Sequence, residues 1–162
     1  MRTLGKIAVK VLVVFIALTG CQLTPLAVKS AYAQAIPSTR VQDFIFDVVW
    51  CRKQETQVTC RLLVTNQTED RSISLETPKI KLYGDIGDVY DASIVRLGNQ
   101  QGSAVNNFKL PLRIPIQAEL RFDKVDPDMK GVAMLDILFT ATTRAGSMGY
   151  YSAQIRDIPL LK

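Results

Sequence analysis

Residues 44–64 read Phe44-Ile-Phe-Asp-Val-Val-Trp-Cys-Arg-Lys-Gln-Glu-Thr-Gln-Val-Thr-Cys-Arg-Leu-Leu-Val64, and this stretch decides the fold class. Apolar and polar residues alternate on both sides of a polar centre, which is the pattern of two half-buried β-strands. A two-residue turn at Glu55-Thr56 places Cys51 directly opposite Cys60, as in a β-hairpin. The stretch therefore predicts an antiparallel pair of strands at the start of a β domain.

Simple alternation along this hairpin conflicts with the pairing of the cysteines. If the face that carries Phe44 continues through the first strand, Trp50 lies on the inner side and Cys51 lies outside. One extra residue at Val49-Trp50 resolves the conflict, because a β-bulge lets two residues oppose one. We therefore predict a bulge at this point, with the inward-facing pairs Phe46–Val64, Val48–Leu62 and Cys51–Cys60.

The chain has three cysteines, Cys21, Cys51 and Cys60. If Cys21 is removed or acylated, an even pair remains, as expected of a chain that folds in an oxidising compartment. The spacing C-x8-C is not the redox C-x-x-C motif, and two thiolates without further ligands make no zinc site. We expect a structural disulfide that stabilises the fold by roughly 2–3 kcal/mol on the chain-entropy model.

Outward from the hairpin, short strand patterns alternate with turns. We expect a signal segment over 1–33, a linker over 34–40 and one domain over 41–162. Further strands are expected near 73–75, 79–83, 88–97, 114–122, 131–140 and 150–158, with an interruption at Pro78 and an end at Pro159. Turns are expected at 84–88 and 123–130, and the polar stretch Gly98–Asn107 is expected to be the longest loop. This pattern predicts an all-β antiparallel sandwich of about seven to eight strands.

Three stretches resemble the small immunoglobulin-like domain of exported bacterial proteins and lipoproteins. They are Cys60-Arg-Leu-Leu-Val-Thr-Asn66, then Ile80-Lys-Leu-Tyr with Gly87-Asp-Val-Tyr90, and Ala118-Glu-Leu-Arg-Phe122. The resemblance covers residues 41–158 and implies an immunoglobulin-like sandwich. It departs from antibody domains in one respect, since the paired cysteines lie in an early hairpin and would not link two sheets.

The N-terminal segment has the layout of a bacterial secretory signal. Arg2, Lys6 and Lys10 precede an apolar run over 11–18. Leu18-Thr19-Gly20-Cys21 resembles a lipobox, with cleavage before Cys21 and a lipid on its sulfur, whereas Ala31-Tyr32-Ala33 fits cleavage after Ala33 and soluble export. The 18 uncharged residues from 11 to 28 are also long enough for an uncleaved anchor. All three alternatives place the domain outside the cytoplasm, in the periplasm, either soluble or held at the membrane.

Charge argues against nucleic acid as a partner. The net charge of the chain is +5, but residues 1–33 hold four basic residues and no acid. The rest therefore has a net charge of about +1, whereas nucleic-acid binders usually carry a clustered basic face.

Catalysis is not expected either, because the chain has no histidine. Histidine is the usual base for a serine or cysteine nucleophile and the commonest transition-metal ligand. Ala145-Gly146-Ser147-Met148-Gly149 imitates a nucleophile elbow but lacks that base, so it is expected to be a hairpin turn. Paired carboxylates for glycosidase chemistry would have to come from acids such as Glu76, Glu119 or Asp136, and we expect Glu119 to lie with Arg121 on a solvated strand face.

Two groups of acids are weak candidates for calcium. Asp85, Asp88 and Asp91 surround Gly87, and Asp123, Asp126 and Asp128 surround Pro127. Calcium prefers six to eight oxygen ligands, and neither run matches a helix-loop-helix site. No cofactor is expected.

These observations predict a non-enzymatic exported envelope domain that binds or positions a partner, either a protein or another ligand. The alternative is a calcium- or small-ligand-binding module that uses the acidic turns. Recognition is expected in the long loop, whose amide side chains offer donors and acceptors: Asn99, Gln100, Gln101, Asn106 and Asn107. The aromatic residues Trp50, Tyr83, Tyr90, Tyr150 and Tyr151 are expected in the core or on a sheet surface, where tyrosines can form a recognition patch.

Overall fold

The computed structural model describes residues 36–142 and 146–161. All described residues belong to one compact unit. The predicted signal, its cleavage sites and Cys21 lie outside the described residues. Within the described ranges there is no helix long and apolar enough to cross a membrane.

This unit is built of β-strands, which confirms the predicted all-β class. The part of the chain that the structure describes holds eleven strands, and four of them have only three or four residues, which explains the excess over the predicted number. The strands are β1 (Ser38–Val41), β2 (Phe44–Gln54), β3 (Gln57–Asn66), β4 (Arg71–Gly84), β5 (Val89–Asp91), β6 (Ile94–Leu97), β7 (Gln100–Gly102), β8 (Ala104–Leu110), β9 (Ile116–Phe122), β10 (Gly131–Thr142) and β11 (Met148–Leu161).

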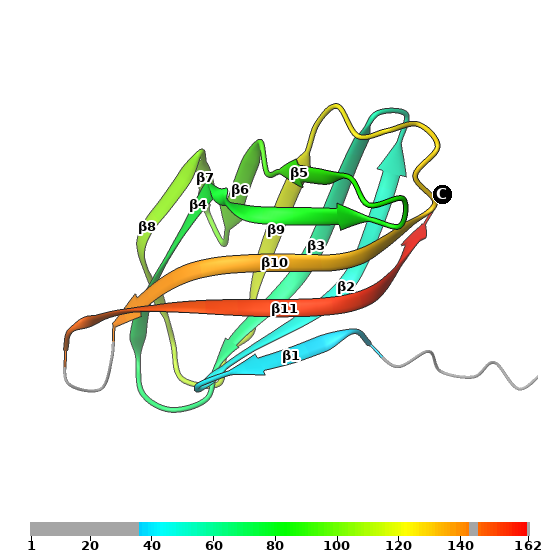
Figure 1. Cartoon of the computed structure of the whole chain (residues 1–162). Helices are drawn as coiled ribbons and strands as arrows, with labels where there is room; N and C mark the ends of the chain where they lie inside the picture. The colour runs from blue at the N-terminus through cyan, green and yellow to red at the C-terminus, as the bar shows by residue number, and fades with distance from the viewer. Residues whose placement is uncertain (1–35, 143–145, 162) are drawn as a thin grey trace, which may run out of the picture. The chain divides into compact units, whose positions relative to one another are not determined.

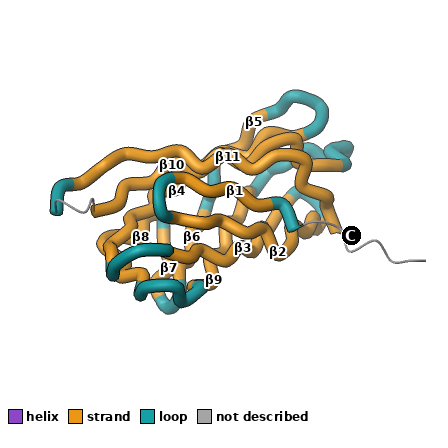
Figure 2. Tube along the Cα trace, turned by 90° about the horizontal axis from the view of Figure 1, so that it is seen from below, coloured by secondary structure: helices purple, strands orange, loops and turns teal. Residues whose placement is uncertain are grey.

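The strands form one curled sheet with the order β5-β4-β10-β11-β2-β3-β9-β6-β7, to which β1 and β8 add beside β2 and β4. Its two halves face each other (Figures 1 and 2). Half A contains β1, β2, β3, β6, β7 and β9, and half B contains β4, β5, β8, β10 and β11. The halves join where the end of β11 pairs in parallel with β2, at Leu160–Cys51 and Leu161–Arg52.

The core lies between the two halves. Phe139 of β10 contacts Phe44 and Phe46 of β2, with ring centroids 5.5 and 5.1 Å apart, and also the ring of Tyr151 at 5.5 Å. Phe44, Phe46 and Phe139 are buried. Burial of such large apolar side chains is the dominant favourable contribution to folding.

The β2–β3 hairpin has the predicted register in full. Phe46 pairs with Val64, Val48 with Leu62 and Cys51 with Cys60, and the register shifts between Val48 and Trp50 as a bulge requires. Cys51 and Cys60 form the predicted disulfide and are buried. Glu55 turns the chain with a φ of 52°.

Two segments predicted to be irregular are strands. The expected linker 34–40 contains the start of β1, which pairs with β2 from Ser38–Asp47 to Val41–Phe44. The expected loop Gly98–Asn107 contains β7 and most of β8. The prediction failed here because the stretch is polar along its exposed side, and Val105 alone is fully buried within it.

Three strand boundaries also differ from the prediction. Pro78 does not interrupt β4, because it lies in an irregular stretch where the register against β10 shifts between Ile137 and Phe139 and no ladder hydrogen bond is needed. The expected strand 88–97 is divided into β5 and β6, which belong to different halves. The final strand runs past Pro159 to Leu161.

Candidate functional site

The outward surface of half A gathers arginine side chains around the single tryptophan. Directly paired residues of neighbouring strands point to the same side of a sheet. The registers therefore place two rows of side chains next to each other on this surface. The first row is Trp50, Arg61, Glu119 and Arg96, and the second is Arg52, Thr59, Arg121 and Ile94. We call these eight residues the arginine face.

Trp50 lies at one end of the face, and two guanidinium groups pack on its ring. The Cζ atoms of Arg61 and Arg52 lie 4.8 and 5.4 Å from the ring centroid. The bulge at Val49 produces this arrangement, because regular alternation from Val48 would turn Trp50 into the core. Trp50 is half-buried, so part of its ring remains open to a ligand.

The arginine face carries more positive than negative charge. Arg61 pairs with Glu119 at 3.4 Å, and Arg121 pairs with the adjoining Asp123 at 3.5 Å. Arg52 and Arg96 are exposed and form no ion pair with any residue the structure describes. The four arginines are therefore balanced by two carboxylates. Arg52 packs on Trp50 and Arg96 Nε donates to the Gly98 carbonyl at 3.3 Å, so these two guanidinium groups carry positive charge with no carboxylate of the described residues beside them.

Asp123 is held in its charged form at the border of the face. Hydrogen bonds from Ser93 and Gln57, with the positive charges of Arg121 and Lys124, lower the pKa of the Asp123 carboxyl. The Gln57 amide donates to Asp123 Oδ1 at 2.8 Å. The carboxylate thus stays negative at neutral pH and fixes the guanidinium of Arg121.

An apolar groove of about 150 Å³ adjoins Trp50. It forms where β1 pairs with residues 44–47 of β2 and β11 pairs with residues 51–52, which leaves Val48, Val49 and Trp50 between them. Its lining is Ile36, Pro37, Val48, Val49, Trp50, Ile158, Pro159 and Leu161. Ile36, Val49 and Leu161 are 65%, 49% and 45% exposed, so the groove presents apolar side chains to solvent.

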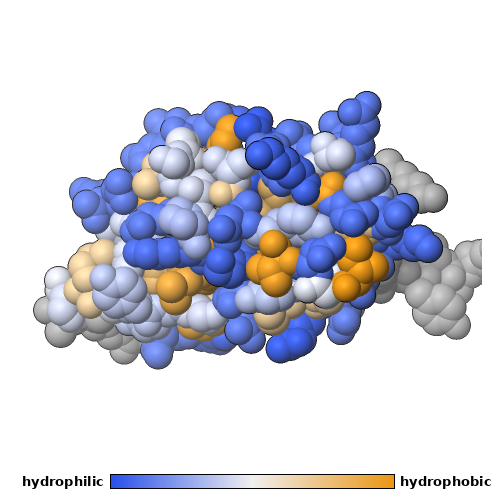
Figure 3. Space-filling model, turned by 45° about the horizontal axis from the view of Figure 1, so that its top comes forward, coloured by the Kyte–Doolittle hydropathy of each residue, from blue (hydrophilic) through white to orange (hydrophobic). Residues whose placement is uncertain are grey.

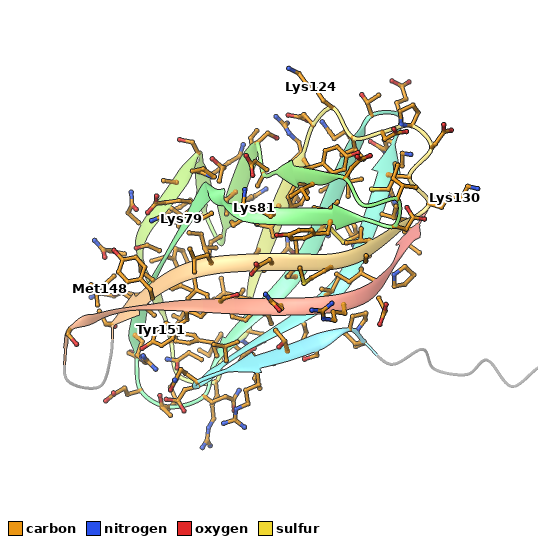
Figure 4. All side chains as sticks on the ribbon, viewed as in Figure 1. Lys79, Lys81, Lys124, Lys130, Met148 and Tyr151 are labelled. Atoms are coloured by element: carbon orange, nitrogen blue, oxygen red, sulfur yellow. A yellow bond between two sulfur atoms is a disulfide. The ribbon has the colours of Figure 1, made fainter. Side chains whose placement is uncertain are left out.

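The outward surface of half B differs in its charge balance. One row contains Asp91, Lys81, Asp136 and Gln154. Lys81 pairs with Asp91 at 2.6 Å, and Asp136 accepts a hydrogen bond from Ser152 at 2.7 Å. Figure 4 shows Lys79 and Lys81 along β4 and shows Met148 and Tyr151 near the start of β11. In the view of Figure 3, hydrophilic side chains cover most of the surface and apolar ones form separate spots.

The three acids of the first predicted calcium group, Asp85, Asp88 and Asp91, each interact with a different residue. Asp85 accepts from the backbone N–H of Lys130 at 3.1 Å, Asp88 accepts from the Tyr90 hydroxyl at 3.2 Å, and Asp91 pairs with Lys81. Residues 36–142 and 146–161 contain no group of three acids or cysteines arranged to hold a metal ion.

The second predicted group of calcium ligands, Asp123, Asp126 and Asp128, lies in a turn whose backbone carbonyls bind a lysine. Lys53 donates from its Nζ to the backbone carbonyls of Asp126 at 2.8 Å and Met129 at 2.9 Å, and also to that of Pro127. A divalent cation at these oxygens would meet a fixed positive charge. Asp128 and Asp126 are joined through the Asp128 backbone N–H and the Asp126 side chain at 2.7 Å.

The predicted recognition loop is not a loop. Asn99 lies in the turn between β6 and β7, Gln100 and Gln101 belong to β7, and Asn106 and Asn107 belong to β8. β7 is part of half A and β8 is part of half B, so the amides belong to strands of different halves. All five are exposed. Gln100 and Gln101 pair with β6, whereas Asn106 and Asn107 lie where the register between β4 and β8 shifts, and the Asn107 backbone N–H donates to the Ser74 hydroxyl at 2.9 Å.

The other predicted residues are also separated. Glu76 pairs with Lys79 at 2.9 Å, whereas Glu119 and Asp136 lie on the outward surfaces of opposite halves. Tyr150 is 70% exposed and Tyr151 packs on Phe139, so these neighbours lie on opposite sides of β11. Ser147 lies just before β11 and is exposed.

Comparisons with known proteins give no family. No family model matches the chain, and no curated protein matches it. The chain is similar in structure to the yeast GGA1 GAE domain, with a TM-score of 0.44, 13% identity, and 75% of this chain and 96% of that chain covered. It is also similar to a DUF4426 family protein from Pseudomonas aeruginosa PAO1, with a TM-score of 0.38, 10% identity, and 79% and 98% covered. The fold assignment therefore rests on the strand pairing of this chain.

Sequence reasoning missed the arginine face although part of its signal was present. The predicted register of the first hairpin already places Arg52 opposite Thr59 and Trp50 opposite Arg61. The other half of the face requires the pairing of β3 with β9 and of β9 with β6, which no local pattern indicates.

Proposed function

We propose that this chain is a non-enzymatic, exported envelope domain that binds an acidic partner through the arginine face. The observation that carries the proposal is the excess of guanidinium groups on one sheet surface, beside a partly open Trp50 and an apolar groove. Tryptophan and arginine are the side chains that most often dominate binding energy at interfaces. Guanidinium groups bind carboxylates and phosphates through two parallel hydrogen bonds.

Export is supported by two independent features of the chain. The first 33 residues have a cationic start, an apolar run and two cleavage patterns. Cys51 and Cys60 are paired in the hairpin, as is usual for chains that fold outside the cytoplasm. We propose the periplasm as the location, with either a lipid on Cys21 or release after Ala33.

A non-enzymatic role is supported by the residues available for chemistry. The chain has no histidine, and the acids that could act as a catalytic pair, Glu119 and Asp136, lie on opposite outward surfaces. The groove beside Trp50 is lined by apolar side chains and offers no nucleophile.

Crosslinking in the native envelope, followed by mass spectrometry of what is captured, tests the proposal. The variant R52Q/R96Q removes two positive charges from the arginine face. The matched control K109Q/R156Q removes two positive charges from exposed positions on β8 and β11 of half B. We expect R52Q/R96Q to lose most crosslinks and the control to retain them. Equal capture by the two variants would contradict the proposal, provided that both keep the melting temperature of the parent chain.

A further inference from the structure

We propose that the acidic partner of the arginine face is the anionic phospholipid surface of the membrane. This inference rests on the proposed function and names the ligand of the same site. It follows from the shape of the face, from the apolar rim beside it, and from the place where the chain enters the domain.

The shape of the face suits an extended array of phosphates. Its four arginines are spread over four neighbouring strands, β2, β3, β9 and β6, which lie about 4.8 Å apart. Its hollows are shallow: the adjoining groove holds about 150 Å³, and a hollow lined by Trp50, Arg52, Gln54, Thr59 and Glu119 holds about 190 Å³, so both are too small for a drug-sized molecule. A bilayer presents many phosphate groups in one plane, so several guanidinium groups can be satisfied at once.

The apolar rim suits the border between headgroups and acyl chains. Ile36, Val49 and Leu161 are exposed around the groove, and Trp50 lies between them and the arginines. Tryptophan is enriched at membrane interfaces because one side of its ring system is apolar and its N–H stays hydrated. Arginine next to it can keep its charge among the headgroups while its stem covers apolar surface.

The chain enters the domain at this rim. Ile36, the first described residue, lines the groove beside Trp50. Fourteen residues lie between Cys21 and Ile36 in the sequence, and a chain of that length spans at most about 50 Å between these two residues. If Cys21 is lipidated, or if residues 11–28 remain as an anchor, the face stays within that distance of the bilayer. Such tethering raises the effective concentration of the face at the membrane.

Trp50 makes the inference measurable, because it is the only tryptophan in the chain. The full chain is reconstituted into vesicles of phosphatidylcholine alone, or of phosphatidylcholine with 30% phosphatidylglycerol. Each preparation is made with and without brominated acyl chains, which quench tryptophan on contact. In this design the apolar N-terminal segment can hold every variant on the vesicles, so quenching reports the position of the domain surface. Each variant is compared with its own spectrum in the absence of vesicles.

We expect Trp50 to be quenched and its emission to shift to the blue on anionic vesicles, and to respond much less on neutral ones. An arginine near an anionic surface strengthens association roughly fivefold, so R52Q/R96Q should lower the ratio of membrane-bound to membrane-free domain surface about 25-fold, read as a loss of most Trp50 quenching. K109Q/R156Q should behave like the parent chain. V49S/L161S should reduce quenching by bromine deep in the acyl region.

A gain-of-charge variant separates binding from loss of folding. E119Q removes the carboxylate that pairs with Arg61, so quenching should increase on anionic vesicles and stay unchanged on neutral ones, whereas a damaged fold would expose apolar core to both. The inference is overturned if Trp50 responds equally on the two vesicle types, or if R52Q/R96Q and E119Q leave quenching unchanged. If that happens while envelope crosslinking still depends on Arg52 and Arg96, the proposed function stands with a different acidic partner. If envelope crosslinking does not depend on Arg52 and Arg96 either, both the proposed function and the membrane inference are wrong.

Discussion

Asp123 illustrates how single residues set the charge of the arginine face. Its carboxylate is held by hydrogen bonds from Ser93 and Gln57 and lies 3.5 Å from the guanidinium of Arg121. Without this carboxylate, Arg121 would be a third arginine available to an acidic ligand. The charge that the face presents to a partner is therefore determined by its neighbours as much as by its arginines.

The lowered pKa of Asp123 predicts a specific dependence of stability on pH. A carboxyl whose pKa is lower in the folded than in the unfolded state stabilises the fold above its unfolded pKa of about 4. That stabilisation is lost as the pH falls through the folded pKa. We therefore expect D123N to be less stable than the parent chain at pH 7, with a difference that shrinks between about pH 4 and lower pH. Urea unfolding at several pH values measures this, and a constant difference would contradict it.

Lys53 shows why an acidic turn need not be a metal site. Its ammonium is bound by backbone carbonyls of the turn at 126–129. From the sequence, the nearby aspartates suggest oxygen ligands for a cation. In the structure, a cation from a different strand already occupies the centre of the turn, and only the tertiary fold reveals this.

At the scale of elements, the β2–β3 hairpin is the part of the fold that the sequence predicts best. Its apolar alternation, its two-residue turn and its cysteines are all local, and together they determine the register and the bulge. The prediction of a loop over Gly98–Asn107 was wrong because this segment lacks such local signals. Its strands are short and exposed. β7 pairs with β6 across the turn at Gly98-Asn99 but has no apolar alternation that would indicate a strand, and β8 pairs with β4, which lies well before it in the sequence.

The disulfide of this hairpin has a predicted energetic effect. Replacing Cys51 and Cys60 together by alanine removes a constraint on a short loop, which contributes roughly 2–3 kcal/mol on the chain-entropy model, and adds a packing defect in the core. We expect the free energy of unfolding in urea to fall by at least that amount. The exported parent protein, unfolded without reductant, should not react with a thiol reagent at either cysteine. Quantitative labelling of both would show that the disulfide does not form in the cell.

At the scale of the whole molecule, the arginine face could not be predicted from composition. Residues 34–162 have a net charge of about +1, which suggests no charged surface. The fold separates the charges, because β2, β3, β9 and β6 bring four arginines to one side of half A while half B pairs Lys81 with Asp91. The arginine face therefore follows from strand pairing between distant parts of the sequence, and the local alternation within each strand does not indicate it.

Because the strand registers show which residues point outward, the same probe can be placed on the outward surface of half A or of half B and the two proteins compared. A photo-reactive phenylalanine analogue at Thr59 would lie in the second row of the arginine face, beside Arg52 and Arg121. The same analogue at Gln154 would lie on the outward surface of half B, beside Asp136. Both positions are on strands and point away from the core, so the two proteins differ mainly in which surface carries the probe.

Photo-crosslinking of these two proteins in living cells tests the central claim most directly, namely that the arginine face is the binding surface. We predict that the probe at Thr59 crosslinks to a ligand, either lipid or protein, and that R52Q/R96Q abolishes this crosslink. The probe at Gln154 should give only background. Crosslinks at Gln154 that equal or exceed those at Thr59, with both proteins folded, would contradict the account.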